Sequence, residues 1–208
     1  MFKIAVTGGA GSGKTFVCSR LKALGLEVIS ADDMAKEAVV PGSAALQKIA
    51  GRFGEEILLP DGSLNRKMLR QIITDDDAAR NTLESILHRE ISTLISENVI
   101  RLEKAGHPMV VIEIPLLYEL DLQNRFDRVI MVSARRELRI RRLMERDSIT
   151  RISAEKLINV QMPDKKKIER ADYVVHNEGS REDLAKSVDM LFKKLSDTVK
   201  GQKALDRQ

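Results

Sequence analysis

The sequence predicts an α/β fold of three layers, in which a five-stranded parallel sheet lies between layers of helices. Short apolar runs rich in Val and Ile recur along the 208-residue chain without alternating polar residues. Such runs are typical of strands that are buried on both faces of a parallel sheet. Helical patterns separate the runs, and repeated strand–helix–strand units produce parallel pairing.

The expected strands and helices alternate along the chain. The strands are predicted at Ile4–Thr7, Glu27–Ser30, Val110–Ile114, Arg128–Val132 and Tyr173–His176. The clearest helices between them are predicted at Lys14–Leu24, Ala134–Glu145 and Arg181–Leu195. We therefore expect a core formed by residues 1–30 and 106–198, followed by a polar, frayed tail over residues 199–208.

One connection is much longer than a crossover requires. Nearly eighty residues, Ala31 to Met109, separate the second expected strand from the third, whereas a crossover needs about a dozen. Helical periodicity within it falls at Ala44–Phe53, Arg66–Ile73 and Ala78–Lys104. We expect residues 31–105 to form an inserted helical sub-domain, since insertions at the carboxyl ends of parallel strands commonly supply a second substrate's pocket.

A second interruption follows Arg142. Residues 143–171 carry short, strongly charged stretches such as Arg146-Asp147 and Lys165-Lys166-Lys167, which indicate helices outside the core. A mobile lid has this character, and so does a solvated helical hairpin. Charge alone favours neither interpretation, and our domain organisation takes this segment as a lid.

The composition excludes several classes of protein. No apolar run approaches the ~18 residues of a membrane span, and the N-terminus lacks the features of a signal peptide. Cys18 is the only cysteine, so an intrachain disulfide is excluded, and we expect a small buried apolar residue there. The expectation is a cytoplasmic protein without membrane partners, either a monomer or a weak homo-oligomer.

The net charge of +4 raises nucleic-acid binding as an alternative. The chain has no Trp, two Tyr and five Phe, and no basic segment carries interleaved aromatic residues on which bases could stack. The most basic stretch, Arg135 to Arg151, holds seven arginines at mixed spacings. We therefore expect a polyanionic small molecule as the partner, and no nucleic acid.

Gly8 to Thr15 reads Gly-Gly-Ala-Gly-Ser-Gly-Lys-Thr and satisfies the P-loop motif G-x-x-x-x-G-K-[ST]. It follows a buried strand and opens a helix, so its N–H groups and the helix N-terminus are expected to point at phosphate oxygens. Lys14 would reach the β- and γ-phosphates of ATP, and the Thr15 hydroxyl would ligate Mg²⁺. Nucleotide contacts are expected from Gly9, Ala10, Gly11, Ser12, Gly13, Lys14, Thr15 and Phe16.

Other P-loop classes carry motifs that this chain lacks. A GTPase needs D-x-x-G after a strand, and this string occurs nowhere in the sequence. The third expected strand ends in Glu113-Ile114-Pro115, without the adjacent acids of AAA-type ATPases. A small-molecule kinase is therefore favoured, and a nucleotide-dependent regulator is the alternative from another class.

Phosphoryl transfer to an alcohol needs a carboxylate that takes the hydroxyl proton. The second expected strand ends in Ser30-Ala31-Asp32-Asp33. In a doubly wound sheet that begins with a P-loop strand, this end lies beside the γ-phosphate. Asp32 or Asp33 is therefore a candidate base, and the other is expected to cap the following helix.

Two further strings give the chain a more specific resemblance. Val28-Ile29-Ser30-Ala31-Asp32 is similar to a strand end that reads D-A-D, and Ile114-Pro115-Leu116-Leu117-Tyr118-Glu119 is similar to the signature P-L-L-[FY]-E. The Arg142/Arg146 pair, Gln161 and the Asn177-x-Gly179 turn follow in matching order. From about Phe2 to Leu195, the chain resembles the dephospho-CoA kinase family.

The resemblance implies that ATP phosphorylates the 3′-hydroxyl of the ribose in dephospho-CoA, giving coenzyme A and ADP. By family position, Asp32 would be the base, and Arg142 and Arg146 would stabilise the transferring phosphoryl group. Asn177 and Gly179 would hold the adenine through backbone contacts. The acceptor site would be bordered by His88, Arg89, Pro115, Leu116, Leu117, Tyr118 and Glu119.

Three positions depart from the family pattern. Ser30 replaces an Asp, Arg89 stands where a Pro usually follows His88, and Glu113 is longer than the Asp common at its position. These departures leave open the detailed geometry around the base and the metal. Another small-molecule kinase of the same fold, acting on a nucleotide, nucleoside or sugar, is the first alternative.

Overall fold

The computed structural model describes residues 1–74 and 76–205. The chain forms two compact units, each with its own buried core. The first unit combines Met1–Ile29 with the described residues from Leu102 onward, and the second is Ser30–Arg101. Among the helices of the described ranges, none combines the length and apolarity that a bilayer crossing requires.

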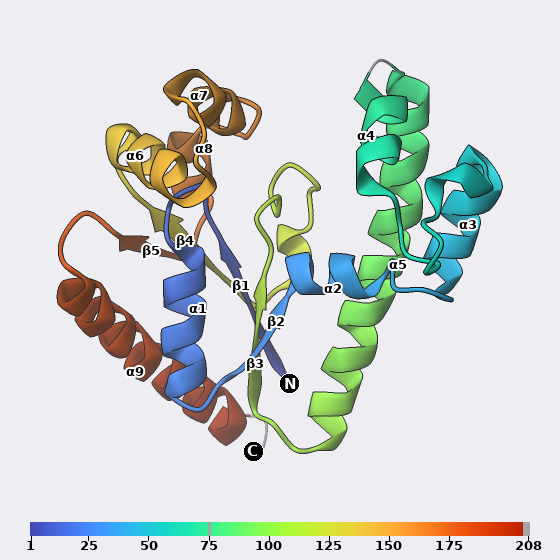
Figure 1. Cartoon of the computed structure of the whole chain (residues 1–208). Helices are drawn as coiled ribbons and strands as arrows, with labels where there is room; N and C mark the ends of the chain where they lie inside the picture. Colours follow the sequence, from blue (N-terminus) through green and yellow to red (C-terminus); the bar gives the residue numbers. More distant parts are fainter. Residues whose placement is uncertain (75, 206–208) are drawn as a thin grey trace. The chain divides into compact units, whose positions relative to one another are not determined.

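The first unit is built on a five-stranded sheet in the order β2-β3-β1-β4-β5 (Figure 1). β1 pairs in parallel with β3 and with β4, and β4 pairs in parallel with β5. The predicted fold class is confirmed, and the strands begin within two residues of their predicted starts. They are β1 (Phe2–Thr7), β2 (Glu27–Ser30), β3 (Met109–Glu113), β4 (Arg128–Ser133) and β5 (Tyr173–His176).

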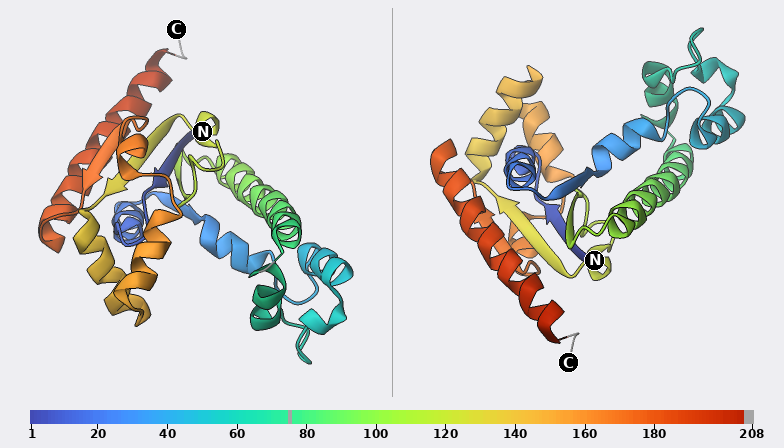
Figure 2. Two further views of the ribbon diagram at one scale, coloured as in Figure 1. Left: turned by 90° about the horizontal axis from the view of Figure 1, so that it is seen from above. Right: turned by 90° about the horizontal axis from the view of Figure 1, so that it is seen from below.

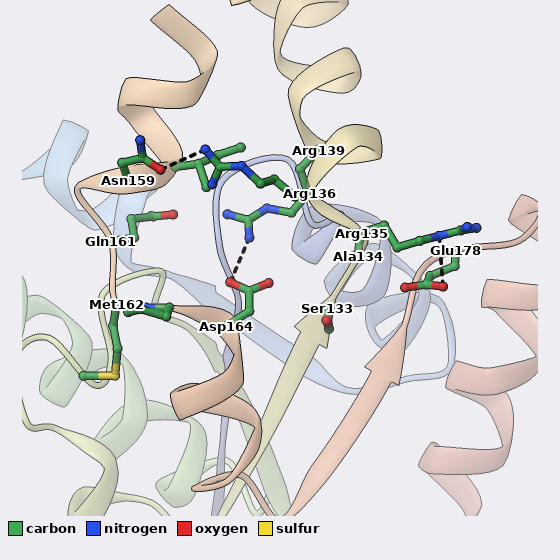
Figure 3. Close-up of a pocket in the computed structure, with 12 residues that line it drawn as sticks. Ser133, Ala134, Arg135, Arg136, Arg139, Asn159, Gln161, Met162, Asp164 and Glu178 are labelled. Atoms are coloured by element: carbon green, nitrogen blue, oxygen red, sulfur yellow. Dashed lines mark hydrogen bonds and ion pairs between the residues drawn. The ribbon is translucent and has the colours of Figure 1, made fainter. Parts of the chain in front are cut away.

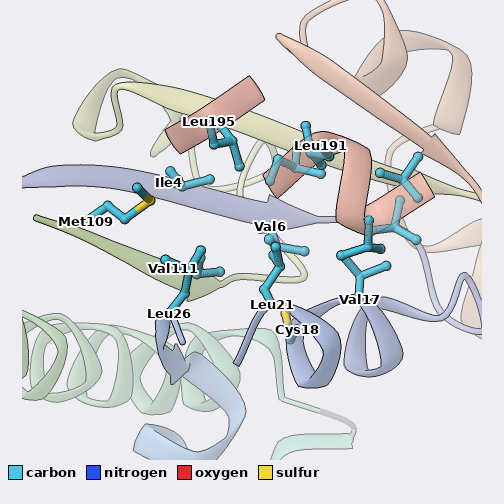
Figure 4. Packing of buried hydrophobic residues seen from close by; sticks show 14 of the residues in the cluster. Ile4, Val6, Val17, Cys18, Leu21, Leu26, Met109, Val111, Leu191 and Leu195 are labelled. Carbon is cyan, nitrogen blue, oxygen red and sulfur yellow. The ribbon is translucent and has the colours of Figure 1, made fainter. Parts of the chain in front are cut away.

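Two helices lie side by side on one face of this sheet: α1 (Lys14–Ala23) and α9 (Arg181–Leu205) (Figure 1). Their buried side chains, such as Leu21 and Leu191, pack in one apolar cluster with Val6 of β1 (Figure 4). This cluster anchors the start of α1 directly after β1, which places the P-loop at the carboxyl edge of the sheet.

The helix α9 is longer than the sequence predicts. The predicted end at Leu195 is wrong, and the tail expected to be frayed from residue 199 is helical as far as residue 205. Val188, Leu195 and Val199 continue one apolar stripe, and Val199 is buried in the same cluster as β1. Burial of this stripe outweighs the polar composition of the tail. Residues 206–208 lie outside the described ranges.

In the chain, three helices lie between β4 and β5. In α6 (Arg136–Asp147) and α7 (Arg151–Asn159), the facing side chains Ile140, Leu143, Ala154 and Ile158 form a small core. The third, α8 (Asp164–Ile168), packs against β4. The Lys167 side chain within α8 is completely buried, which its charge did not predict, whereas Lys165 and Lys166 are exposed. A short 3₁₀ helix, η2 (Gln123–Arg125), precedes β4.

The second unit is helical, as predicted (Figure 2). It buries an apolar cluster of its own. A tight turn at Asp61-Gly62 brings Leu58 and Leu64 into an antiparallel bridge, and Gly62 adopts the positive φ of 78° that this turn requires. The elements are α2 (Ala31–Glu37), α3 (Ala44–Phe53), η1 (Glu55–Ile57), α4 (Arg66–Thr74) and α5 (Asp77–Lys104), the last three residues of α5 belonging to the first unit.

Candidate active site

The P-loop joins β1 to α1, where the motif predicts it. Gly11 and Gly13 have φ angles of 74° and 97°, which an L-residue adopts only with strain. Lys14 Nζ donates to the Gly8 carbonyl oxygen at 2.9 Å, which folds the ammonium back over the loop. Thr15 is exposed in the first turn of α1. The loop therefore has the curved backbone of a phosphate cradle, with a cation at its edge.

Two residues from distant parts of the chain fill the space around this loop. A Cβ atom on Gly9 would overlap the Arg139 guanidinium, and one on Gly11 would lie 2.7 Å from the Arg139 carbonyl oxygen. A Cβ atom on Gly13 would overlap the Asn177 side-chain amide. Side chains at these positions would displace the packing partners, and at Gly11 and Gly13 the positive φ also favours glycine.

Asn177 and Arg142 meet at the P-loop. Asn177 follows β5, is 7% exposed, and donates through Nδ2 to the Ser12 carbonyl oxygen at 2.8 Å. Arg142 Nη2 donates to Asn177 Oδ1 at 3.1 Å, and its Nη1 donates to the Gly11 carbonyl oxygen at 3.4 Å. Partial burial, with a smaller contribution from Arg141, lowers the pKa of the Arg142 guanidinium below its ordinary value. The sequence prediction paired these two residues with the nucleotide, and the structure brings them together with the loop.

Arg139 is a site residue that the sequence analysis missed. Its side chain is 5% exposed, its Nε donates to the Ala10 carbonyl oxygen at 2.8 Å, and its Nη1 lies 2.8 Å from Asp164 Oδ1. The Ala10 N–H donates to Gln161 Oε1, also at 2.8 Å. A signal for Arg139 existed in the sequence, since it precedes Arg142 by one helical turn. It could not be separated from the other arginines of α6 without the fold.

Figure 3 shows a cavity of about 370 Å³ beside these residues, between the end of β4, the start of α6 and the α7–α8 turn. Its charged and polar lining groups are largely paired with one another. Arg139 faces Asp164, Arg136 Nη2 donates to Asn159 Oδ1 at 2.9 Å, and Arg135 Nε lies 3.2 Å from Glu178 Oε2. The charges of Arg139 and Arg135 are therefore compensated locally, whereas Arg136 bonds to a neutral amide.

The signature segment Pro115–Glu119 follows β3 in the same unit. Leu117 and Tyr118 are buried, Pro115 is half-buried, and Leu116 is 40% exposed. Thr7 Oγ1, at the end of β1, donates to the Pro115 carbonyl oxygen at 3.3 Å. Burial raises the pKa of the Tyr118 phenol above its ordinary value, and Arg170 lies 4.6 Å from its ring centroid. Most of this segment is thus packed into the unit, with Leu116 presented to solvent.

Glu119 points back into the structure. Its Oε1 accepts a hydrogen bond from the Met162 N–H at 2.9 Å and lies 2.7 Å from the ammonium of Lys167. The Lys167 side chain is fully buried, whereas that of Glu119 is 20% exposed. Since a buried ammonium needs an opposite charge, Glu119 is required to compensate Lys167.

The two candidate bases lie in the first turn of α2, in the second unit. The prediction that one of them caps this helix is wrong, because the N-cap is Ser30, whose Oγ accepts from the Asp33 N–H at 3.3 Å. The residue that departs from the family pattern thus acquires a local role in ending β2 and starting α2. The Asp33 carboxylate lies 2.7 Å from Lys36 Nζ, and both Asp32 and Asp33 are exposed.

The other predicted site residues lie on different elements of the structure. His88 and Arg89 are exposed on α5 of the second unit. Arg146 points to Asp147, with two contacts of 2.7 Å, and Gly179 is exposed in the turn after β5. The Phe16 side chain packs against the core of the first unit, which leaves only its backbone on the P-loop side.

Metal-binding side chains do not gather in the described ranges, where no group of three or more His, Cys, Asp or Glu residues could hold an ion. Cys18, a residue of α1, is buried in the core cluster of the first unit, as predicted. Burial, and secondarily the nearby Glu113 carboxylate, raises the pKa of its thiol, so the thiol stays protonated.

Comparisons with known proteins give related sequences and structures. The family model of dephospho-CoA kinase matches residues 2–183. A dephospho-CoA kinase of Syntrophotalea carbinolica is 40% identical over 97% of this chain and 95% of its own. A crystal structure from Thermus thermophilus superposes with a TM-score of 0.79 at 32% identity, covering 93% of this chain and 97% of its own. A dephospho-CoA kinase from Campylobacter jejuni superposes with a TM-score of 0.72 at 26% identity, covering 94% and 98%.

Proposed function

The chain belongs to the dephospho-CoA kinase family, which carries out the final step of coenzyme A biosynthesis, and we propose that it transfers the γ-phosphoryl group of ATP to the 3′-hydroxyl of the dephospho-CoA ribose. The observation that carries this proposal is the P-loop backbone held between Lys14, Arg142 and the buried Asn177. A loop whose curvature is set before the nucleotide arrives needs less reorganisation to bind phosphate, and such preorganisation is how enzymes stabilise charge in a transition state.

The nucleotide would be bound by the loop from Gly9 to Phe16, with the N-terminus of α1 favouring negative charge. Lys14 would neutralise the β- and γ-phosphates. Arg142 would stabilise charge on the transferring group, and its engagement with Asn177 supports that role because it orients the guanidinium toward the loop. Arg146 and Gly179 would complete the nucleotide site, with the adenine held at the backbone of Asn177.

Asp32 would be the general base. The 3′-hydroxyl oxygen attacks the γ-phosphorus, the bond to the β–γ bridging oxygen breaks, and ADP leaves, while the hydroxyl proton passes to the Asp32 carboxylate. The choice of Asp32 over Asp33 is supported by the ion pair of Asp33 with Lys36, which commits that carboxylate to a local partner. Asp32 is exposed and carries no such pair in the described ranges.

Mg²⁺ would neutralise charge on the β- and γ-phosphates when it is bound with the nucleotide. The residues fit this ion, since Mg²⁺ usually takes one or two protein ligands beside phosphates and water, and Thr15 offers its hydroxyl at the end of the loop. The Thr15 side chain is exposed at this point, so it can reach an ion on the phosphates.

The acceptor would be bordered by His88 and Arg89 on α5 and by the segment Pro115, Leu116, Leu117, Tyr118 and Glu119. The exposure of Leu116 supports a contact with the acceptor, because its neighbours in the segment are mostly packed inward. Residues 31–105 would form the acceptor-binding sub-domain and residues 143–171 a lid that excludes water. We further propose a cytoplasmic enzyme that is a monomer or a weak homo-oligomer and does not act on nucleic acid.

The test is release of ADP from ATP in a coupled assay with purified protein. We expect turnover with dephospho-CoA and none above background with AMP, CMP or shikimate, and the product should carry its new phosphate on the 3′-oxygen by NMR. Lys14→Ala serves as the inactive control, which separates acceptor-dependent transfer from contaminating hydrolysis. Turnover of another acceptor in preference to dephospho-CoA would contradict the proposal.

A further inference from the structure

The apex of the P-loop, Gly9-Ala10-Gly11, is held by side chains from outside the motif. Both main-chain groups of Ala10 are engaged, the N–H by Gln161 Oε1 and the carbonyl oxygen by Arg139 Nε, each at 2.8 Å. These partners lie 151 and 129 residues away in sequence. The N–H belongs to the Gly9–Ala10 peptide and the carbonyl oxygen to the Ala10–Gly11 peptide, so the two hydrogen bonds hold the peptide units on both sides of the Ala10 Cα atom.

The Arg139 side chain is itself immobilised. It is 5% exposed, and its Nη1 lies 2.8 Å from Asp164 Oδ1, with the Asp164 side chain 19% exposed. A guanidinium taken this far out of water requires an opposite charge in good geometry. The planar fork of Arg can serve Ala10 and Asp164 at the same time, which a Lys could not do with one ammonium. Arg139 also occupies the space above Gly9, so the apex cannot shift toward it.

The turn that carries Gln161 and Asp164 is anchored from its other side. Met162 stands between them in this turn (Figure 3), and its N–H donates to Glu119 Oε1 at 2.9 Å. The same oxygen lies 2.7 Å from the buried ammonium of Lys167, in the helix that begins at Asp164. A continuous series of contacts therefore runs from the signature segment, through the α7–α8 turn, to the P-loop apex.

We propose that Arg139, Gln161 and Asp164 form a clamp that positions Ala10, and that Glu119 anchors this clamp. Glu119 therefore acts on nucleotide binding, although it ends the segment that borders the acceptor. These are positioning residues, because none of them needs to touch a phosphate. The proposal deepens the proposed function and rests on it for the identity of the acceptor.

The expected effect follows from the cost of ordering the loop. Without the clamp, the apex would sample other conformations and would have to be ordered when ATP binds. Fixing one or two residues of backbone in this way weakens binding by ~5–30-fold. Affinity for the acceptor should stay unchanged, since the contacts of the clamp are with the P-loop and the α7–α8 turn.

The experiment measures the Kd of ADP by calorimetry, and kcat with both KM values, for Asp164→Asn and Glu119→Gln. Both substitutions keep the shape of the side chain and remove its charge. We expect the Kd of ADP and the KM of ATP to rise by ~5–30-fold in each variant, with the KM of dephospho-CoA changed less than about twofold. Arg139→Lys keeps the positive charge but loses the planar fork, so we expect it to lose less affinity for ADP than Arg139→Met.

The matched control is Arg136→Met, because Arg136 lies on the same helix, lines the same cavity and bonds to Asn159 instead of the P-loop. It should bind ADP like the wild type. A thermal melt of each variant identifies those that fail to fold, and Arg139→Lys, which keeps a positive charge opposite Asp164, keeps the test available if the charge-removing variants do not fold.

Unchanged ADP binding in folded Asp164→Asn would overturn the clamp. A rise in the KM of dephospho-CoA in Glu119→Gln, with ADP binding intact, would move Glu119 to the acceptor site. The ADP measurement needs no acceptor, so a wild-type protein that binds ADP but does not phosphorylate dephospho-CoA would contradict the proposed function while leaving this inference testable.

Discussion

The P-loop in the first unit and the first turn of α2 in the second are both proposed to act on the same phosphoryl group, and they are held in different ways. Around the P-loop, the partners come from Arg139, Arg142, Gln161 and Asn177, all more than a hundred residues away in sequence. In α2 the partners lie within three residues, since Ser30 caps the helix through the Asp33 N–H and Lys36 pairs with the Asp33 carboxylate.

This difference indicates which substitutions should reduce activity without reducing the stability of the fold. The loop is part of a packed network, so a change there affects stability and nucleotide binding together. The start of α2 is locally organised and its Asp32 is exposed, so a change there can remove a chemical group without disturbing the fold.

The largest expected effect is that of Asp32→Asn, which removes the proposed base and keeps its shape. We expect kcat to fall by ~10²–10⁴-fold, because an amide cannot take the hydroxyl proton. The melting temperature and the affinity for ATP should stay near wild type, measured by calorimetry. The control is Asp33→Asn, which should retain activity within a few-fold, and the reverse pattern would transfer the role of base to Asp33.

Gly11→Ala should come next, and it tests the packed side of the comparison. The new Cβ would be strained by the φ of 74° and would approach the Arg139 carbonyl oxygen to 2.7 Å. We expect a loss of ~2–4 kcal/mol in the free energy of unfolding and a fall of ~5–15 °C in Tm, together with weaker ATP binding.

The matched control for that substitution is Gly51→Ala in the last turn of α3, where a Cβ atom would meet no atom within 4 Å. It should raise stability by ~0.5–1 kcal/mol, because Ala has the better helix propensity and the site is exposed. Equal losses in the two variants would show that the P-loop glycines are not special in their packing.

Asn177→Ala should have an intermediate effect. It leaves the Ser12 carbonyl oxygen without its donor and removes one acceptor of Arg142. The expected cost is ~1–3 kcal/mol of stability, with an approximately tenfold rise in the Kd of ADP. Denaturant unfolding and calorimetry measure the two quantities. A stable variant with normal ADP affinity would show that the loop holds its shape without the residue after β5.

The smallest effect is expected at the exposed pair that joins α1 to α9. The Arg20 guanidinium, 2.7 Å away, holds the pKa of Asp189 below its ordinary value of 3.8. A depressed carboxyl pKa adds stability above the unfolded pKa, and this stability is lost as the pH falls through the folded value.

Asp189→Asn should therefore melt slightly below wild type at pH 7, and the two melting curves should converge in acid below pH 3.8. Activity should not change, because both residues lie on the helices behind the sheet. A difference in Tm that persists unchanged in acid would show that the side chains act by packing, with no electrostatic contribution.

The sequence by itself determined the fold class, the strand positions, the P-loop and the family, because these depend on local patterns. A buried strand is a short apolar run, and the P-loop is a string of eight residues whose backbone conformation depends largely on its own glycines. The pairing of Arg142 and Asn177 with the nucleotide site was also predicted, although only through the family resemblance.

Only the tertiary structure decided which of the charged residues work together. Arg139 and Asp164 are ordinary charges in the sequence, and Lys167 looks solvated within three consecutive lysines, yet the fold buries Arg139 and Lys167 against carboxylates. The end of α9 depended in the same way on whether Val199 had a core to enter. Burial and ion pairing are set by segments that meet in space, so no pattern of neighbouring residues could have revealed them.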